Sequence, residues 1–124
     1  MNDHRVIVGE RDVLIVDDKP ANLRLLAQML TERGFKVRAV TSGARALATI
    51  AVMPPDLVLL DIKMPGMSGF EVCEELKANP QTHDIPIIFI SALDEVTDKV
   101  NAFHVGGVDY ITKPFQLEEV LERV

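Results

Sequence analysis

Three aspartates, a serine and a lysine each stand where a short apolar run ends, and their types suit phosphoryl chemistry. These residues are Asp17, Asp18, Asp61, Ser91 and Lys113. Three neighbouring carboxylates repel one another and resist ionising together unless a cation is supplied. An all-oxygen cluster of this kind suits Mg²⁺, which takes one or two carboxylates, keeps several waters and binds phosphate oxygens. Zinc is disfavoured, because no Cys or His belongs to the set.

Asp61 is the expected reactive group of this set. Lys113 adds a positive charge suited to a phosphoryl oxygen, and Ser91 adds a hydroxyl donor. A carboxylate nucleophile, a divalent cation and a lysine together favour phosphoryl transfer, in which catalysis is mostly positioning and charge neutralisation. A single aspartate after a strand is more often a turn former or a helix cap. The functional interpretation therefore depends on all five residues meeting at one place.

The apolar runs predict the strands that would bring these side chains together. The runs cover residues 13–16, 35–40, 57–60, 85–90 and 108–111. The run over 57–60 is apolar at every position, which is typical of a strand buried on both faces of a parallel sheet. In such a sheet the carboxyl ends of the strands meet at one edge, where ligands and chemistry gather.

Apolar residues at helical spacing predict a helix after each strand. The first covers 20–33, with Pro20 in its first turn and Gly34 just behind it. Apolar positions from 46 to 51 mark the second helix. The third begins at Ser68, where Ser68-Gly69-Phe70-Glu71 matches the capping-box motif. The fourth covers 96–103, and the fifth begins at Leu117. The alternation predicts a doubly wound α/β fold, with helices on both faces of a parallel sheet and right-handed crossovers.

The composition excludes several other classes of protein. The chain of 124 residues suits one domain, and its net charge of −6 argues against a nucleic-acid-binding module, which carries a basic patch. The single cysteine, Cys73, favours a reducing, cytoplasmic setting, and its place on an apolar helix stripe predicts a buried small hydrophobe. No apolar run approaches the roughly 20 residues that span a bilayer. The first residues also lack the basic segment followed by an apolar segment that is typical of a signal peptide.

In its motifs the chain resembles a response-regulator receiver domain of two-component signalling. The resemblance rests on Asp17-Asp18 after the first strand, Asp61 with Met64-Pro65-Gly66 after the third, Ser91 after the fourth, and Lys113-Pro114 after the fifth. It covers residues 12–124 and leaves 1–11 as an N-terminal extension. It implies a flavodoxin-like (βα)5 three-layer sandwich with strand order 2-1-3-4-5. It also implies that Asp61 takes a phosphoryl group from the phosphohistidine of a sensor histidine kinase.

The same resemblance implies a ligand set for Mg²⁺. Asp17, Asp18, the Asp61 carboxylate and the backbone carbonyl of Lys63 would hold the ion. One residue of the Asp17-Asp18 pair could instead cap the first helix. We expect both to lie near the metal and one to bind it directly.

The resemblance also implies a switch. Ser91 hydrogen-bonds the phosphoryl group and Lys113 pairs with it, while Tyr110 rotates inward as the Ser91 hydroxyl moves. The alternative is that Tyr110 is only a packing residue at the end of a strand. The Lys113-Pro114 peptide bond is expected to be cis. The output surface is expected over the helix 96–103, the strand 108–111 and the helix that begins at 117.

Two further positions are expected to set the lifetime of the acyl phosphate. The Lys63 side chain can reach the phosphoryl site, and the apolar Leu93 could hinder the hydrolytic water. Replacing both by small polar residues should therefore change the rate of dephosphorylation.

Three other functions fit parts of the pattern. A small-molecule aspartyl-phosphate hydrolase would carry Asp-x-Asp after its first strand and a cap insertion, neither of which is present here. A flavin-binding relative would need a Ser/Thr/Gly-rich phosphate loop after the first strand, where Asp17-Asp18 would repel phosphate unless a metal ion were bound. A non-phosphorylated receiver-like interaction module is the principal alternative, although such modules lose some of the five residues, and all are present here.

The expected partners follow from the resemblance. They are the kinase, a C-terminal output domain or downstream protein, and a second copy on activation. The fifth helix stops early at Val124, which suggests a longer protein whose output is a histidine kinase or a cyclic-dinucleotide enzyme. The domain itself is expected to bind neither nucleic acid nor membranes. It would be no enzyme beyond Mg²⁺-dependent self-phosphorylation and autodephosphorylation.

Overall fold

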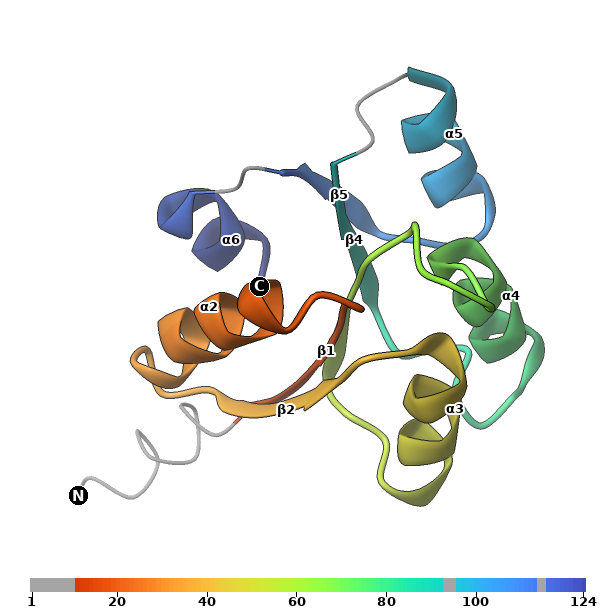
Figure 1. Cartoon of the computed structure of the whole chain (residues 1–124). Helices are drawn as coiled ribbons and strands as arrows, with labels where there is room; N and C mark the ends of the chain where they lie inside the picture. Colours follow the sequence, from red (N-terminus) through yellow and green to blue (C-terminus); the bar gives the residue numbers. More distant parts are fainter. Residues whose placement is uncertain (1–10, 93–95, 114–115) are drawn as a thin grey trace.

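The computed structural model describes residues 11–92, 96–113 and 116–124, which form one parallel sheet covered by helices. The strands are β1 (Asp12–Val16), β2 (Lys36–Val40), β3 (Leu57–Leu60), β4 (Ile87–Ser91) and β5 (Asp109–Thr112). The helices are α2 (Pro20–Thr31), α3 (Gly43–Val52), α4 (Gly69–Ala78), α5 (Val96–His104) and α6 (Leu117–Arg123). The strand order is β2-β1-β3-β4-β5 and all pairings are parallel (Figure 1). The predicted doubly wound, flavodoxin-like fold is therefore confirmed.

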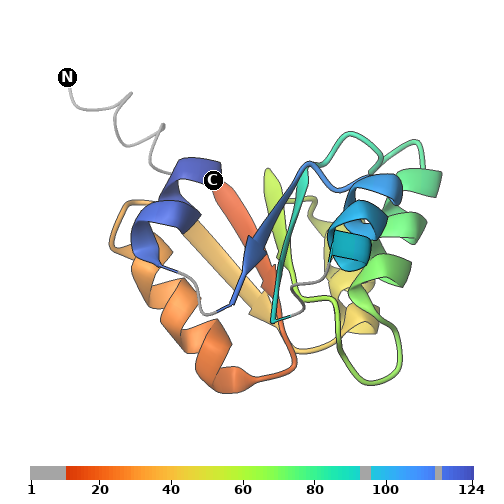
Figure 2. The same cartoon turned by 90° about the horizontal axis from the view of Figure 1, so that it is seen from above.

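The two faces of the sheet carry separate apolar cores. In Figure 2, α2 and α6 lie on one face, and α3, α4 and α5 lie on the other. Alternate strand residues point to opposite faces, so Ile15 belongs to the cluster that contains Leu26 of α2, while Leu14 belongs to the cluster that contains Val72 of α4. Every residue of β3 is buried, which confirms the interpretation of the fully apolar run at 57–60.

Several boundaries differ from the sequence prediction by one to three residues. Strand β4 begins at Ile87 rather than 85, because Pro86 has no N–H to donate to a neighbouring strand and contributes only its carbonyl, which accepts from Val58 N at 3.1 Å. Strand β5 is shifted by one residue to Asp109–Thr112, and β2 begins at 36 rather than 35. Helix α2 ends at Thr31 rather than at 33, since the backbone hydrogen bonds from Arg33 N and Gly34 N span only three residues and lead into Gly34, at φ 93°.

The local signals for α4 are confirmed. Ser68 is the N-cap, its hydroxyl accepts from Glu71 N at 3.2 Å, and the Glu71 carboxylate accepts from Ser68 N at 2.9 Å. These reciprocal bonds form the predicted capping box. They fix the start of α4 and thereby the loop between β3 and α4, which carries several residues of the candidate site.

Cys73 is fully buried on α4, as its place on the apolar stripe predicts. Its thiol donates to the Val105 carbonyl at 3.3 Å. Burial raises the pKa of this thiol to about 11, so the reactive thiolate is scarce at neutral pH. Across the described residues, no helix is both long and apolar enough to cross a membrane.

Candidate functional site

The ends of four strands hold the site residues in place. Asp17 follows β1, Asp61 follows β3, Ser91 is the last residue of β4, and Lys113 follows β5. The backbone of each extends the sheet pairing: Asp17 N donates to Val40 O at 3.3 Å, Asp61 N to Val16 O at 2.9 Å, and Lys113 N to Ser91 O at 2.8 Å. The predicted meeting at one edge of the sheet is therefore present, on backbone that the sheet holds rigidly.

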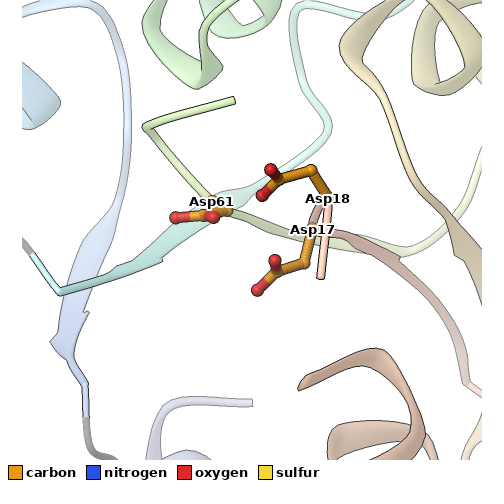
Figure 3. A group of neighbouring side chains, drawn as sticks. All are labelled: Asp17, Asp18 and Asp61. Carbon is orange, nitrogen blue, oxygen red and sulfur yellow. The ribbon is translucent and has the colours of Figure 1, made fainter. Parts of the chain in front are cut away.

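The three aspartates form one acidic cluster. Each offers a carboxylate oxygen that lies within 4.8 Å of an oxygen from each of the other two. Figure 3 shows Asp17 and Asp18 leaving β1 while Asp61 approaches from β3. Beside them opens a cavity of about 540 Å³, lined by Asp18, Lys19, Asn22, Asp61, Lys63, Met64, Pro65, Ser91, Ala92 and Lys113.

Asp17 is the best-satisfied member of the cluster. It is fully buried, and its Oδ1 accepts from Lys19 N at 2.9 Å. Its Oδ2 accepts from Lys113 Nζ at 2.8 Å and from Asn22 Nδ2 at 3.2 Å. Asp17 is therefore held by three donors, and it is not among the residues that line the cavity.

Asp18 differs from its neighbour Asp17 in lining the cavity. Its Oδ1 is buried, yet it has no hydrogen-bond partner in the part of the chain that the structure describes. Buried oxygens of this kind are nearly always paired in proteins, with a protein group, a water or an ion. The orphaned oxygen therefore marks a position at which the site can hold a cation.

Asp61 combines burial with crowding by other charges. Its side chain is 7% exposed, and its Oδ1 accepts from Ile62 N at 2.9 Å. Burial raises the pKa of the Asp61 carboxyl, the Lys113 ammonium 3.6 Å away opposes that rise, and Asp17 adds to it. A cation placed beside Asp61 would favour its ionised form.

The remaining predicted residues occupy different surroundings. Ser91 is buried and Lys63 is exposed, and both line the cavity. Tyr110 is 8% exposed and belongs to the core cluster shared with α3, α4 and α5. Leu93 and Pro114, on which the lifetime and cis-peptide predictions rest, lie outside the described residues.

Comparison with known proteins identifies the family. A family model described as the response regulator receiver domain matches residues 13–124. This chain belongs to that family. A relative from Synechocystis, the DNA-binding transcriptional regulator RpaA, is 39% identical over 112 residues, which cover 90% of this chain and 46% of the relative. A relative from Vibrio cholerae, whose name is "Probable cyclic di-GMP phosphodiesterase", is 43% identical over 112 residues, which cover 90% of this chain and 25% of the relative.

A solved structure agrees with the fold of this receiver domain. The BeF3-activated receiver domain of Klebsiella pneumoniae RstA superposes with a TM-score of 0.84 at 33% identity, covering 91% of this chain and 94% of that one. The curated relatives are longer, since this chain spans only 25–46% of the two named above.

The acidic cluster of this receiver domain fits a hard divalent cation. Its donors are all carboxylate oxygens, one of them buried without a partner, and the adjoining cavity has room for water ligands. In the described residues, no His or Cys belongs to this group, so the donor set does not suit zinc.

Two residues that support the site were not predicted from the sequence. Asn22, five residues after Asp17, places its amide on the Asp17 carboxylate. Gly69, the first residue of α4, lies against the backbone of Asp61, where a Cβ would overlap the Asp61 carbonyl oxygen. The glycine directly after the Ser68 cap was the available signal for Gly69, because a small residue there permits close approach of two backbones.

Removing the Asp61 charge is expected to stabilise the fold in Mg²⁺-free buffer. A raised pKa means that the folded state holds the Asp61 proton more tightly than the unfolded state, so wild-type stability falls as pH rises above the ordinary carboxyl pKa of 3.8. Asp61→Asn should therefore be more stable than wild type at pH 7, and the difference should shrink as the pH falls through the ordinary carboxyl pKa. Urea unfolding across this range measures it. Exposed Asp84→Asn is the control, and a destabilised Asp61→Asn at pH 7 would contradict the account.

Proposed function

We propose that this receiver domain is a phosphorylation-controlled switch of a two-component phosphorelay, with Asp61 as the phosphoryl acceptor. One observation carries the proposal: Lys113 Nζ lies 2.8 Å from Asp17 Oδ2 and 3.6 Å from Asp61 Oδ2, beside a cavity that adjoins three aspartates. A nucleophilic carboxylate, a cation-binding cluster and a lysine are thus gathered at one edge of the sheet. Family membership supports a histidine kinase as the donor and the cytoplasm as the setting.

In the proposed reaction, an Asp61 oxygen attacks the phosphorus of the kinase's phosphohistidine. A new O–P bond forms, and the P–N bond to the imidazole breaks with its electron pair returning to nitrogen. Asp17, Asp18, Asp61 and the backbone carbonyl of Lys63 would hold Mg²⁺, which when bound neutralises charge on the phosphoryl oxygens. The Lys113 ammonium balances the remaining negative charge, and the Ser91 hydroxyl donates to a phosphoryl oxygen.

The proposed output is a shift of α5, β5 and α6. Ser91 pairs with Thr112 in the β4–β5 register, and Tyr110 pairs with Phe89 on the same two strands. A displacement of the Ser91 hydroxyl toward a phosphoryl group would therefore shift the neighbouring strand β5 and the buried Tyr110 ring. Lys63, at the cavity wall, and Leu93 are proposed to tune how long the acyl phosphate survives.

Residues 12–124 are proposed to act as the receiver unit of a longer protein, with 1–11 as an extension. The name of the RpaA relative includes DNA binding, and that of the Vibrio cholerae relative is "Probable cyclic di-GMP phosphodiesterase". These names support an attached output domain, or a downstream partner, that carries the final activity. The receiver itself would only take up and release its own phosphoryl group, and would pair with a second copy on activation.

Beryllofluoride, which mimics a phosphoryl group, tests the switch. With Mg²⁺ present it should change the amide NMR signals of Ser91, Tyr110 and α5–β5–α6 in the wild type, and it should leave Asp61→Asn unchanged. Sedimentation of the same samples reports pairing between copies. Wild-type spectra that do not respond would instead favour a non-phosphorylated interaction module.

A further inference from the structure

The side chain of Asn22 makes a contact that the proposed function does not use. Asn22 lies in the first turn of α2 and lines the cavity, and its Nδ2 donates to Asp17 Oδ2 at 3.2 Å. Polar residues near a helix start usually accept hydrogen bonds from free backbone N–H groups. Here the amide instead donates to a fully buried carboxylate, so helix capping does not explain it.

The Asp17 oxygen that Asn22 contacts accepts a hydrogen bond from one other described side chain. Asp17 Oδ2 accepts from Lys113 as well as from Asn22, while the backbone N–H of Lys19 donates to Oδ1. Lys113 also lies 3.6 Å from Asp61, so its ammonium is shared between the two carboxylates. Pairing with a phosphoryl group on Asp61, as the proposed reaction requires of Lys113, would draw this ammonium away from Asp17. Asn22 is then the only described side chain still donating to Asp17 Oδ2.

We propose that Asn22 is a positioning residue that holds the Asp17 carboxylate in the cation-binding cluster, both before and after Lys113 turns to the phosphoryl group. The inference rests on the proposed function and adds a residue to it. A metal-binding carboxylate is itself usually held by a hydrogen bond, and losing such a partner typically costs 10–100-fold in metal affinity or activity. The contact at 3.2 Å is neutral on the Asn22 side, so the lower end of that range applies.

Calorimetric titration with Mg²⁺ alone, without any phosphodonor, tests the role of Asn22. Asn22→Ala should weaken Mg²⁺ binding about tenfold. Asn22→Leu keeps most of the side-chain volume without a donor and should show the same loss. Gln28→Ala on the same helix is the matched control, because it removes an exposed amide–carboxylate bond to Glu32, 3.3 Å long and on the helix surface. It should bind Mg²⁺ like the wild type.

Phosphorylation kinetics give a second readout that loss of stability alone would not produce. For Asn22→Ala and Asn22→Leu, the Mg²⁺ concentration for half-maximal rate should rise about tenfold, while the rate at saturating Mg²⁺ stays near that of the wild type. Wild-type Mg²⁺ affinity in either variant would overturn the inference. If the wild type itself fails to bind Mg²⁺ or to be phosphorylated, the proposed function fails instead.

Discussion

Lys113→Met is expected to lower the free energy of unfolding by about 3 kcal/mol in Mg²⁺-free buffer. The Lys113 side chain is 15% exposed, and its ammonium pairs at 2.8 Å with the carboxylate of Asp17, whose side chain has no exposure at all. Methionine keeps most of the aliphatic stem, so the change removes the charge rather than the packing. Three carboxylates then remain together without the ammonium that lies beside two of them, and a buried charge without its partner is strongly destabilising.

Added Mg²⁺ should restore much of the stability lost in Lys113→Met, because a divalent cation replaces the missing positive charge. The wild type should gain less from the same addition. Urea unfolding with and without Mg²⁺ measures both effects. Lys63→Met, at an exposed lysine on the wall of the same cavity, is the control and should change stability by less than about 0.5 kcal/mol. A Lys113→Met protein as stable as the wild type would show that the Lys113–Asp17 ion pair does not stabilise the fold.

Gly69→Ala is expected to cost about 3 kcal/mol of stability and to slow phosphorylation of Asp61. An added Cβ would overlap the Asp61 carbonyl oxygen and would lie 2.8 Å from the Cα of Ile62. Both are backbone atoms, so neither can rotate away as a side chain would. Gly69 N also donates to Ile62 O at 2.7 Å, which ties α4 to the loop that follows Asp61. The clash would therefore push the phosphoryl acceptor out of place.

Gly66→Ala separates this clash from the ordinary cost of replacing a glycine. Gly66 has φ +77°, and a Cβ added there would meet no atom within 4 Å, so alanine is strained at this position but not crowded. Its cost should be about 1–2 kcal/mol, without displacement of Asp61. Urea unfolding and phosphorylation rates of both variants make the comparison. The account of Gly69 is wrong if its alanine variant is the milder of the two.

The sequence pattern was sufficient to predict the sheet and the residues at its edge. Apolar runs that end in polar residues locate the strands, and a parallel sheet brings their ends together whatever the details of packing. The strand order came from the family resemblance and is confirmed. Boundaries shifted where a single backbone group decides them, as at Pro86, which cannot donate to a neighbouring strand.

The different surroundings of the Asp17 and Asp18 side chains could not be predicted from the sequence. Adjacent residues leave a strand end in different directions. Only the packed structure shows Asp17 fully buried and held by three donors, and Asp18 lining the cavity with a buried oxygen that has no hydrogen-bond partner among the described residues. The same limit applies to Asn22 and Gly69, whose roles depend on which group lies opposite them. A helix-start asparagine and a glycine after a cap are too common to indicate a site alone.

The phosphoryl-accepting role of Asp61 is tested most directly by incubating the protein with Mg²⁺ and a small acyl phosphate donor. Intact-mass spectrometry detects the added phosphoryl group, and borohydride trapping followed by peptide mapping locates it. We expect one phosphoryl group per chain on Asp61, with none in Asp61→Asn and none when EDTA removes Mg²⁺. An unmodified wild type, a phosphoryl group on another residue, or equal modification of Asp61→Asn would contradict this role.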